Sequence, residues 1–369
     1  MDYMTTKAAA ELWGLQQRTV QKYCAKGIIP DCLRHGRAWL IPACAVCPAQ
    51  TDLPQEHSPS ASAPGGKAYA RLLKTQFQKG NYFSPPFAEL SSALRSLDGQ
   101  DRFDCLQSLV QHMIMTGDFE GFSHLRREFL APPYQTEEQE IQADAVYALV
   151  AVAMFDPGRI PGWLTGRDFR NWSPSQRPFL LHLNARCMFM LRQLDIAKAV
   201  AESYLALTPA PSEDLYLTTC MRLLCAAVCN EQGDDEGSRR WIEAALERAL
   251  PQGILGPFIE LHALLGGSLE RCMKDRYPAE LAHLLKMQDK AGQGWIRFYH
   301  RYHDVDTGEH LSLTEFYAGR YLEHGMSYAE AADRLDLTPG QINAVVRSLY
   351  EKKNIHSKKE IRILPKKQE

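Results

Sequence analysis

The chain has 369 residues, enough for about two or three domains that each bury a core. Its composition, 45% hydrophobic and 23% charged, is that of an ordinary soluble protein, and no run of about eighteen or more apolar residues could cross a membrane. The N-terminus lacks the charged-then-apolar layout of a secretory signal, so we expect a cytoplasmic protein.

The net charge of −2 conceals an uneven distribution. Residues 1–46 carry six Lys and Arg against three Asp and Glu, and residues 311–369 carry ten against eight, so the middle holds an excess of seven negative charges. Basic ends around an acidic middle favour contact with nucleic acid at the two ends. Most of the ten Cys residues are spread singly along predicted helices, which indicates reduced thiols in the core.

The first predicted elements are two short helices and a hairpin. The spacing predicts one helix over residues 7–12, capped by Thr5 or Thr6, and a second over 16–26, with Val20 and Tyr23 facing inward. Two short apolar runs around a turn at residues 34–37 then predict a hairpin over 32–42. The sequence therefore favours a helix-turn-helix followed by a wing.

This stretch is similar to the MerR/excisionase type of winged helix-turn-helix. The similarity rests on residues 6–9, 14–15, 18–20 with Tyr23, and 27–30. It implies that the second helix enters the major groove and that the wing meets the adjacent backbone. The residues that it places against DNA are Arg18, Thr19, Gln21, Lys22 and Lys26 on the second helix, with Arg34 and Arg37 at the wing tip. The alternative is that these cations only form a solvated helix face.

Two features surround this module. The four residues Cys24, Cys32, Cys44 and Cys47 could hold zinc, but Cys24 lies within a helical pattern and the spacings are irregular, so we expect no metal. Residues 47–66 are rich in Pro, Ser and Ala and cannot build a core. They predict a flexible linker that lets the module move independently.

Residues 67–306 are predicted to be helical throughout, with apolar residues at three- and four-residue spacing. A helix-start signature recurs, because residues 117–121 and 233–237 match at four of five positions and 194–199 is a looser copy. The first Asp of the three copies lies at positions 118, 195 and 234, so one gap is almost twice the other. These gaps indicate a repeat of about 39 residues with a degenerate copy near 156–158.

Helical hairpins of this length are typical of TPR-like solenoids. Residues 243–269 are also similar to the last repeats of the TPR-type sensor region in large LuxR regulators related to the maltose activator. The resemblance implies a concave surface that takes a peptide, a protein partner or a small-molecule effector. An irregular all-α bundle is the alternative.

Residues 307–369 form the last predicted domain, with three short amphipathic helices over 311–363. A polar break at 336–338 separates two of them, where Thr338 can cap the next helix and Pro339 can occupy its first position. That is the layout of a helix-turn-helix.

The stretch resembles the LuxR-type DNA-binding module over about one seventh of the chain. The matching positions are Glu315, 325–327, Glu330, Ala331, Ala332, 334–335, Leu337, Ile342, 349–350, Lys352 and Ser357. The resemblance implies DNA contacts from Thr338, Gln341, Asn343 and Arg347 in the groove and from Lys352, Lys353, Lys358 and Lys359 on the backbone.

The DNA-facing positions depart from the LuxR pattern. Asn343, followed by Ala344 and Val345, stands where that family usually carries Lys, and Asp336 replaces the turn Gly. An acid near the phosphates and few cations weaken the electrostatic attraction. We therefore expect the N-terminal module to supply much of the affinity for DNA.

Catalytic motifs are absent from the sequence. It has no GxxxxGK[ST] phosphate loop, GxSxG, HExxH or dinucleotide fingerprint, so we expect no enzymatic activity and no cofactor. The cluster His300, His303, Asp304, Asp306 and His310 could be a metal site, and its Asp pair could be an acid/base pair. We interpret residues 300–310 as a polar interdomain loop.

The sequence thus predicts a mainly α chain with an N-terminal winged helix-turn-helix (1–46), a linker (47–66), a TPR-like repeat domain (67–306) and a LuxR-type helix-turn-helix (307–369). The function that fits is that of a bacterial transcription regulator that binds double-stranded DNA, as a homodimer if symmetric half-sites supply its specificity. The alternatives are a protein-interaction scaffold with degenerate helix-turn-helix docking modules, and a mobile-element excision or directionality factor.

Overall fold

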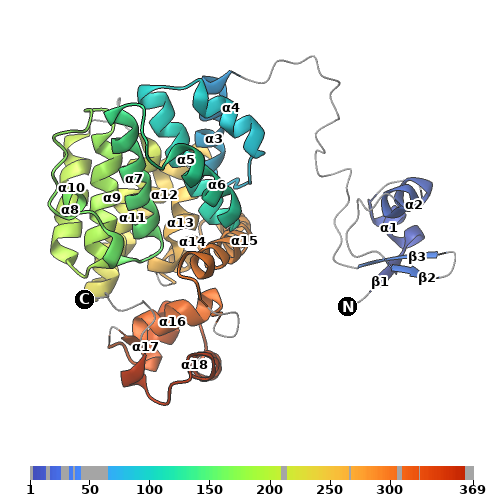
Figure 1. The fold of residues 1–369 in the computed structure, drawn as a ribbon. Coiled ribbons are helices and arrows are strands. Elements are labelled where there is room, and N and C mark those ends of the chain that lie inside the picture. Colours follow the sequence, from blue (N-terminus) through green and yellow to red (C-terminus); the bar gives the residue numbers. More distant parts are fainter. Residues whose placement is uncertain are drawn as a thin grey trace. The chain divides into compact units, whose positions relative to one another are not determined.

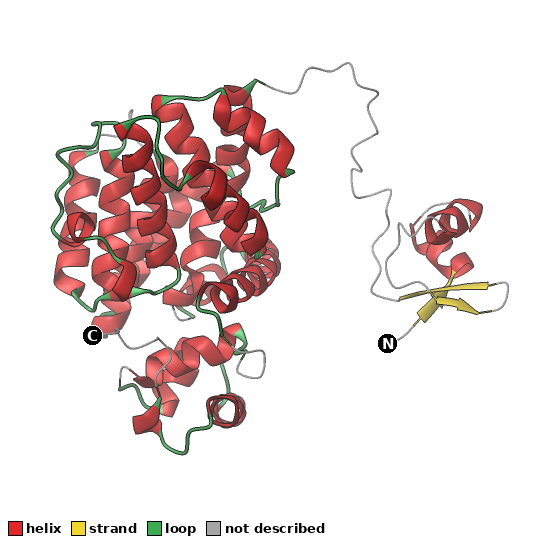
Figure 2. Cartoon of the chain, viewed as in Figure 1, coloured by secondary structure: helices red, strands yellow, loops and turns green. Residues whose placement is uncertain are grey.

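The computed structural model describes residues 3–13, 17–25, 33–35, 38–42, 65–208, 214–265, 267–305, 310–323 and 325–361. These residues are mainly helical (Figure 2). The chain divides into two compact units, Met1–Ala63 and Pro64–Glu369. The predicted linker and its surroundings, residues 43–64, lie outside the described residues.

The first unit combines two helices, α1 (Thr6–Trp13) and α2 (Gln17–Ala25), with a three-stranded antiparallel sheet (Figure 1). Its strands are β1 (Tyr3–Thr5), β2 (Leu33–His35) and β3 (Ala38–Pro42), in the order β1-β3-β2. Both helices and the hairpin were predicted. Strand β1 was not predicted, because three residues that pair across the chain with β3 carry no local periodic signal.

The core of the first unit is small. Ala9, Val20 and Ile41 are fully buried, Ala10 and Cys24 are nearly so, and Met4 and Trp39 pack around them. The predicted inward position of Val20 is confirmed, whereas the side chain of Tyr23 lies outside the description. Thr5 is the cap, because its hydroxyl accepts a hydrogen bond from the Ala8 backbone N–H at 3.2 Å.

The described part of the second unit is helical. Its first ten helices are α3 (Gly66–Gln78), α4 (Phe87–Arg95), α5 (Gly99–Thr116), α6 (Phe119–Phe129), α7 (Glu137–Ala153), α8 (Gly162–Thr165), α9 (Arg177–Met190), α10 (Leu194–Leu207), α11 (Leu215–Gln232) and α12 (Asp235–Ala249). They are followed by α13 (Gly256–Leu265), α14 (Ser268–Met273), α15 (Pro278–Tyr302), α16 (Leu313–Glu323), α17 (Tyr328–Arg334) and α18 (Pro339–Lys353). Short 3₁₀ turns occur at η1 (Pro157–Arg159), η3 (Leu250–Gln252) and η5 (Lys358–Glu360).

Helix pairs recur at regular intervals in this unit. Helices α5, α7, α9, α11 and α13 begin at positions 99, 137, 177, 215 and 256, so one pair follows another every ~40 residues. Each is followed by a helix of equal or shorter length that reverses the chain (Figure 1). The interval agrees with the repeat length that the sequence predicts.

The Gly-Asp signature is a helix-to-helix turn. In residues 117–121, Gly117 ends α5 at a φ of +77°, and Asp118 accepts a hydrogen bond from the Gly121 backbone N–H at 2.8 Å. Residues 233–237 repeat this turn with the same hydrogen-bond distance. A Cβ on the last Gly of either copy would collide with the capping carboxylate. Glycine is therefore favoured at the first position of the signature by its backbone conformation, and it is needed at the last position to leave room for the carboxylate.

The looser copy at residues 194–199 was aligned incorrectly from the sequence. The left-handed residue of the turn is Gly117, Phe155, Arg192 and Gly233 in the four copies, which are almost evenly spaced along the chain. Gln193 therefore occupies the position of Asp118, and Asp195 lies two positions farther on, in the first turn of α10. The degenerate copy near 156–158 is present, because Asp156 caps the 3₁₀ turn η1.

The first helices of the pairs pack side by side in chain order, and α3 joins the first of them to the last. Each of α5, α7, α9 and α11 packs on the next, and α3 contacts both α5 and α13. The long helix α15 lies across the C-terminal ends of α5 and α7, where Trp295 Nε1 donates to the Ala153 carbonyl at 3.1 Å and Arg297 to the Thr116 carbonyl at 3.1 Å. Helices α16–α18 share the hydrophobic core of α3–α15.

Candidate nucleic-acid interface

Helix α2 presents a polar face of the kind that a recognition helix needs. Arg18 and Gln21 are exposed and Thr19 is half-buried, whereas Val20 and Cys24 are buried on the opposite side. This division follows from the 3.6-residue period of the helix. Three of the predicted DNA-contacting residues thus lie on or beside an accessible face.

The remaining residues predicted from the N-terminal resemblance are only partly described. Lys26 and Arg37 lie outside the described residues, and the side chain of Lys22 is not described although its backbone belongs to α2. Arg34 was expected at the wing tip, but it lies inside β2, opposite Trp39 of β3. The correction follows from the hairpin register, which leaves only residues 36–37 between the paired strands.

Gln17 was missed by the sequence analysis. It is exposed at the first residue of α2, next to Arg18, and its side chain donates to the Thr6 hydroxyl of α1 at 3.2 Å. The N-terminal residues of a recognition helix are those that reach base edges. Its position at the start of the second helix could have identified it from the sequence.

The C-terminal helices begin with reciprocal caps. Ser327 and Glu330 form a capping box at the start of α17, and Thr338 and Gln341 form another at the start of α18. Thr338 was predicted as a cap, and this is confirmed, with Pro339 at the first helical position. The Gln341 Oε1 atom accepts from the Thr338 backbone N–H and hydroxyl, both at 2.8 Å.

Helix α18 exposes a face that is poor in charge. Gln341, Asn343 and Arg347 are exposed, as expected of groove-facing residues, while Ile342 and Val346 are buried against α16 and α17. Asp336, just before the helix, has a φ of +52°, a left-handed conformation that glycine adopts most easily. Lys353 is half-buried near the C-terminal end of α18.

Lys352 has a different role from the predicted contact with the DNA backbone. Its ammonium group bonds both oxygens of Glu315 on α16, at 2.9 and 2.6 Å. Glu315 is only 5% exposed and also accepts from the Ser348 hydroxyl at 2.6 Å and from the Ser312 backbone N–H at 2.6 Å. The ion pair fixes α18 to α16, and it turns Lys352 inward. The side chain of Lys358 is also engaged, with the carbonyls of Gly325 and Met326.

Burial by itself would raise the pKa of Glu315. Hydrogen bonds from Lys352, Ser348 and the Ser312 backbone outweigh this effect and lower the pKa below its ordinary value of 4.5. Glu315 is therefore ionised at neutral pH and holds the positive charge of Lys352.

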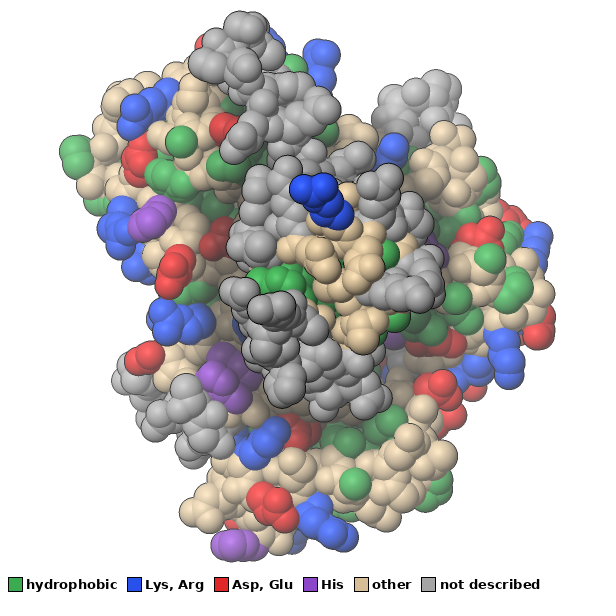
Figure 3. All heavy atoms as spheres, turned by 90° about the vertical axis from the view of Figure 1, so that its right-hand side faces the viewer, with side chains coloured by type: hydrophobic (Ala, Val, Ile, Leu, Met, Phe, Trp, Pro, Cys, Tyr) green, Lys and Arg blue, Asp and Glu red, His purple; other side chains and the backbone are tan. Residues whose placement is uncertain are grey.

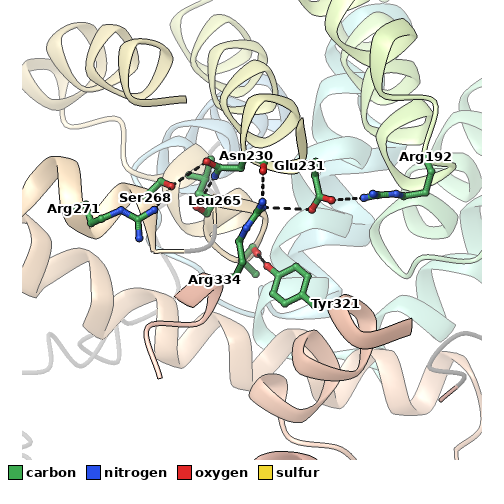
Figure 4. Close-up of polar contacts among 9 residues, drawn as sticks. Arg192, Asn230, Glu231, Leu265, Ser268, Arg271, Tyr321 and Arg334 are labelled. Atoms are coloured by element: carbon green, nitrogen blue, oxygen red, sulfur yellow. Dashed lines mark hydrogen bonds and ion pairs between the residues drawn. The ribbon is translucent and has the colours of Figure 1, made fainter. Parts of the chain in front are cut away.

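Helices α16 and α17 are docked on the repeat helices by polar contacts (Figure 4). Arg334, at the end of α17, donates to the Asn230 carbonyl of α11, and its Nη1 atom lies 3.8 Å from a Glu231 oxygen. Glu231 also pairs with Arg192 at 2.5 Å. Because the Glu231 side chain is only 6% exposed, water screens these pairs less than surface pairs.

One further contact crosses this junction, and two more join the repeat helices beside it. The Tyr321 hydroxyl of α16 donates to the Ala263 carbonyl at 2.6 Å, and the Asn230 side chain donates to the Leu265 carbonyl at 2.7 Å (Figure 4). Ser268 donates to Asn230 at 3.1 Å. The exposed side of α18 takes no part in these contacts, so it stays accessible while α16 and α17 are docked.

The predicted polar loop at 300–310 is partly helical. Helix α15 continues through Tyr302, because Phe298 and Tyr299 extend its buried face. His300 is 6% exposed and stacks on His310 at a ring distance of 4.1 Å. No group of three or more His, Cys, Asp or Glu suited to a metal occurs among the described residues, which do not include Asp306.

Charges on the second unit are mixed. On the face drawn in Figure 3, Lys and Arg side chains lie among Asp and Glu side chains. The same holds on α18, where Arg347 and Glu351 are both exposed one turn apart. Because neighbouring charges of opposite sign cancel, the long-range electrostatic attraction of DNA to these two surfaces is weak.

Comparison with known proteins identifies one part of the chain. Residues 3–44 match a family model described as a helix-turn-helix domain. No curated protein and no solved structure matched the chain. Across the described ranges, no helix is both long enough and apolar enough to span a membrane. The chain thus carries an N-terminal helix-turn-helix of a kind associated with DNA binding.

Proposed function

We propose that this protein is a sequence-specific DNA-binding transcription regulator that uses its N-terminal helix-turn-helix as the main DNA contact. The observation that carries the proposal is the family match over residues 3–44. Within this stretch, helix α2 exposes Arg18 and Gln21 and buries Val20. Arg can read guanine and Gln can read adenine in the major groove. The hairpin β2–β3 would be the wing that meets the adjacent phosphates.

The second part of the proposal concerns α17 and α18, which we assign as a LuxR-type second DNA-binding module. Asn343 and Arg347 are exposed on α18 and accessible to a groove. Lys352 is held by Glu315, so the electrostatic contact of this module with the DNA backbone would be weaker than the sequence implied. The N-terminal module would then supply most of the affinity.

The helical middle would act by binding and not by catalysis. Its paired helices recur at a regular interval, as they do in helical-repeat domains, and we assign it a sensor role toward a peptide, protein or small-molecule effector. Its contacts to α16 and α17 through Arg334 and Tyr321 would transmit the effector's presence. A homodimer on symmetric half-sites would complete the recognition of an operator.

The test is direct binding of the full-length chain to DNA. A randomised duplex pool is selected on the purified protein, and the affinity for the enriched sequence is measured from low to moderate salt. We expect Arg18→Ala to weaken binding by about tenfold or more and to reduce the salt slope by about one unit, because one cationic contact is lost. Lys286→Ala, an exposed cation on α15, is the control and should change neither.

Genome-wide mapping of bound DNA separates the possible roles. Sites in front of many genes support a regulator, whereas sites only at the ends of mobile elements support an excision factor. If the selection enriches no sequence and the protein binds no duplex even at low salt, the proposed function is wrong.

A further inference from the structure

A pocket of about 510 Å³ lies beside α15. It is bounded by the segment after α3, by Met115 and Thr116 at the end of α5, and by one face of α15. Its volume is within the range of sites that hold small organic molecules, about 300–1,000 Å³. None of its lining residues belongs to α2 or α18, the helices that we assign to DNA.

The walls of this pocket combine an apolar surface with positive charge. Apolar atoms come from aromatic and Met side chains, and the polar groups are amides, hydroxyls and two cations. The cations are Lys290 and Arg297, which are seven positions apart on α15 and therefore lie on one side of the helix, about 10 Å apart along its axis. Among the described residues that line the pocket there is no Asp or Glu.

The two cations are not neutralised within the described structure. Neither Lys290 nor Arg297 forms an ion pair with a described carboxylate, and both are exposed. Arg297 is nevertheless held in place, because its guanidinium donates to the Thr116 carbonyl at 3.1 Å. A Cβ on Gly117 would lie 3.0 Å from the Arg297 Nε atom, so the chain approaches this side chain closely.

The apolar surface lies beside the cations. Tyr82 directs its hydroxyl away to the Gly256 carbonyl, at 3.4 Å, while Phe83 and Met287 are half-buried at the pocket wall. Ser84 and Thr116 share a hydrogen bond of 3.0 Å at the rim. A ligand with an apolar body and a negatively charged end matches this distribution of groups.

We propose that this pocket binds a small organic anion, with its carboxylate or phosphate between Lys290 and Arg297 and its apolar body against Tyr82 and Met287. This inference deepens the effector part of the proposed function, and it does not depend on DNA binding. Arginine suits such a site because its planar fork can hold an oxyanion with two hydrogen bonds.

The position of the pocket connects it to the C-terminal helices. Ala291 lines this pocket and also a gap of about 40 Å³ that Leu313 and Tyr317 of α16 help to line. Gly292 packs so closely on Leu313 that a Cβ there would collide with it. A ligand that pulls α15 toward the C-terminal end of α5 would therefore move the helix against which α16 packs.

The experiment measures binding of defined probes to the full-length protein by isothermal titration calorimetry. The probes are 2-naphthoate and phenyl phosphate, and the neutral control is 2-naphthamide, which matches the naphthoate body without its charge. We expect at least one anion to bind tenfold or more tightly than the amide. Equal binding of acid and amide, or no binding of either anion, would overturn the proposal.

Charge variants on one helix provide the matched test. Lys290→Gln and Arg297→Gln should each weaken binding of the anion by about tenfold, whereas Lys286→Gln, one turn earlier, exposed and outside the pocket, should leave it unchanged. Thermal melting confirms that each variant is folded. If Lys286→Gln weakens binding as much as Lys290→Gln does, the attraction is general surface charge and the assigned site is wrong. Failure of DNA binding with intact anion binding would instead reject only the proposed function.

Discussion

Glu315 is a buried charge that joins two of the C-terminal helices, α16 and α18. It comes from α16 and accepts hydrogen bonds from Ser348 and Lys352 of α18 and from the Ser312 backbone. Such a carboxylate stabilises a fold only as long as each of its partners stays in place, because an uncompensated buried charge is costly. The residue thus explains why α18 is fixed against α16.

We expect Glu315→Gln to lower the free energy of unfolding of the second unit by about 2 kcal/mol. The value lies below the range for fully buried pairs, about 3–5 kcal/mol, because the Lys352 side chain is 33% exposed. Urea unfolding followed by circular dichroism measures it. Glu351→Gln, at an exposed position of α18, is the control and should change stability by less than about 0.5 kcal/mol.

The same residue predicts a pH dependence. The folded state lowers the pKa of Glu315, so its stabilising effect is complete above the ordinary value of 4.5 and is lost as the pH falls through the lower folded value. The stability difference between the natural protein and Glu315→Gln should therefore be constant from pH 7 to about pH 5 and shrink below 4.5. A difference that grows on acidification would contradict the assigned ion pair.

At the scale of elements, the repeat depends on its turns. A left-handed residue follows the first helix of each pair, and in two copies an Asp caps the next helix over a glycine that leaves room for its carboxylate. Phe155 and Arg192 adopt the same backbone conformation without glycine, so the turn is set by packing as well as by sequence. This explains why the signature is visible in only part of the chain.

Replacing Gly237 with Ala tests the turn. The added methyl group would collide with the Asp234 carboxylate and displace the cap of α12, and the loss of a cap costs about 0.5–2 kcal/mol. Gly162→Ala is the matched control, because nothing lies within 4 Å of its Cβ position and its φ is not positive. We expect the control to be neutral or to stabilise by up to about 1 kcal/mol, and equal melting temperatures for the two variants would contradict the account.

At the scale of the whole molecule, α16–α18 belong to the same compact unit as the repeat helices. Leu311, Phe316 and Tyr321 are buried in the shared core, and Arg334 reaches α11 (Figure 4). A module that shares a core with its neighbour responds to changes in that neighbour more directly than one on a flexible tether. The first unit, in contrast, has a core of its own.

Arg334→Ala is expected to loosen this junction. It removes a hydrogen bond and an ion pair whose acceptors are largely buried, and hydrogen bonds of charged groups contribute about 1.5–3 kcal/mol. Amide hydrogen exchange in α16 and α17 should become about tenfold faster or more, while α5 and α9 stay protected. Arg347→Ala, on the exposed face of α18, should leave exchange unchanged. Equal exchange in both variants would show that Arg334 does not hold the module.

The sequence by itself determined the helical character of both units, the hairpin, the repeat interval and the Thr338 cap, because these follow from local periodicity and from turn and capping chemistry. It also placed Arg18 and Gln21 on the exposed side of α2. Only the tertiary structure decided the short strand β1, the inward turn of Lys352 and the partner of Arg334. Lys352 and Glu315 are 37 positions apart in the chain, and Arg334 and Asn230 are 104 apart. Contacts at such separations leave no periodic trace in the chain, and they arise only when packing brings the helices together.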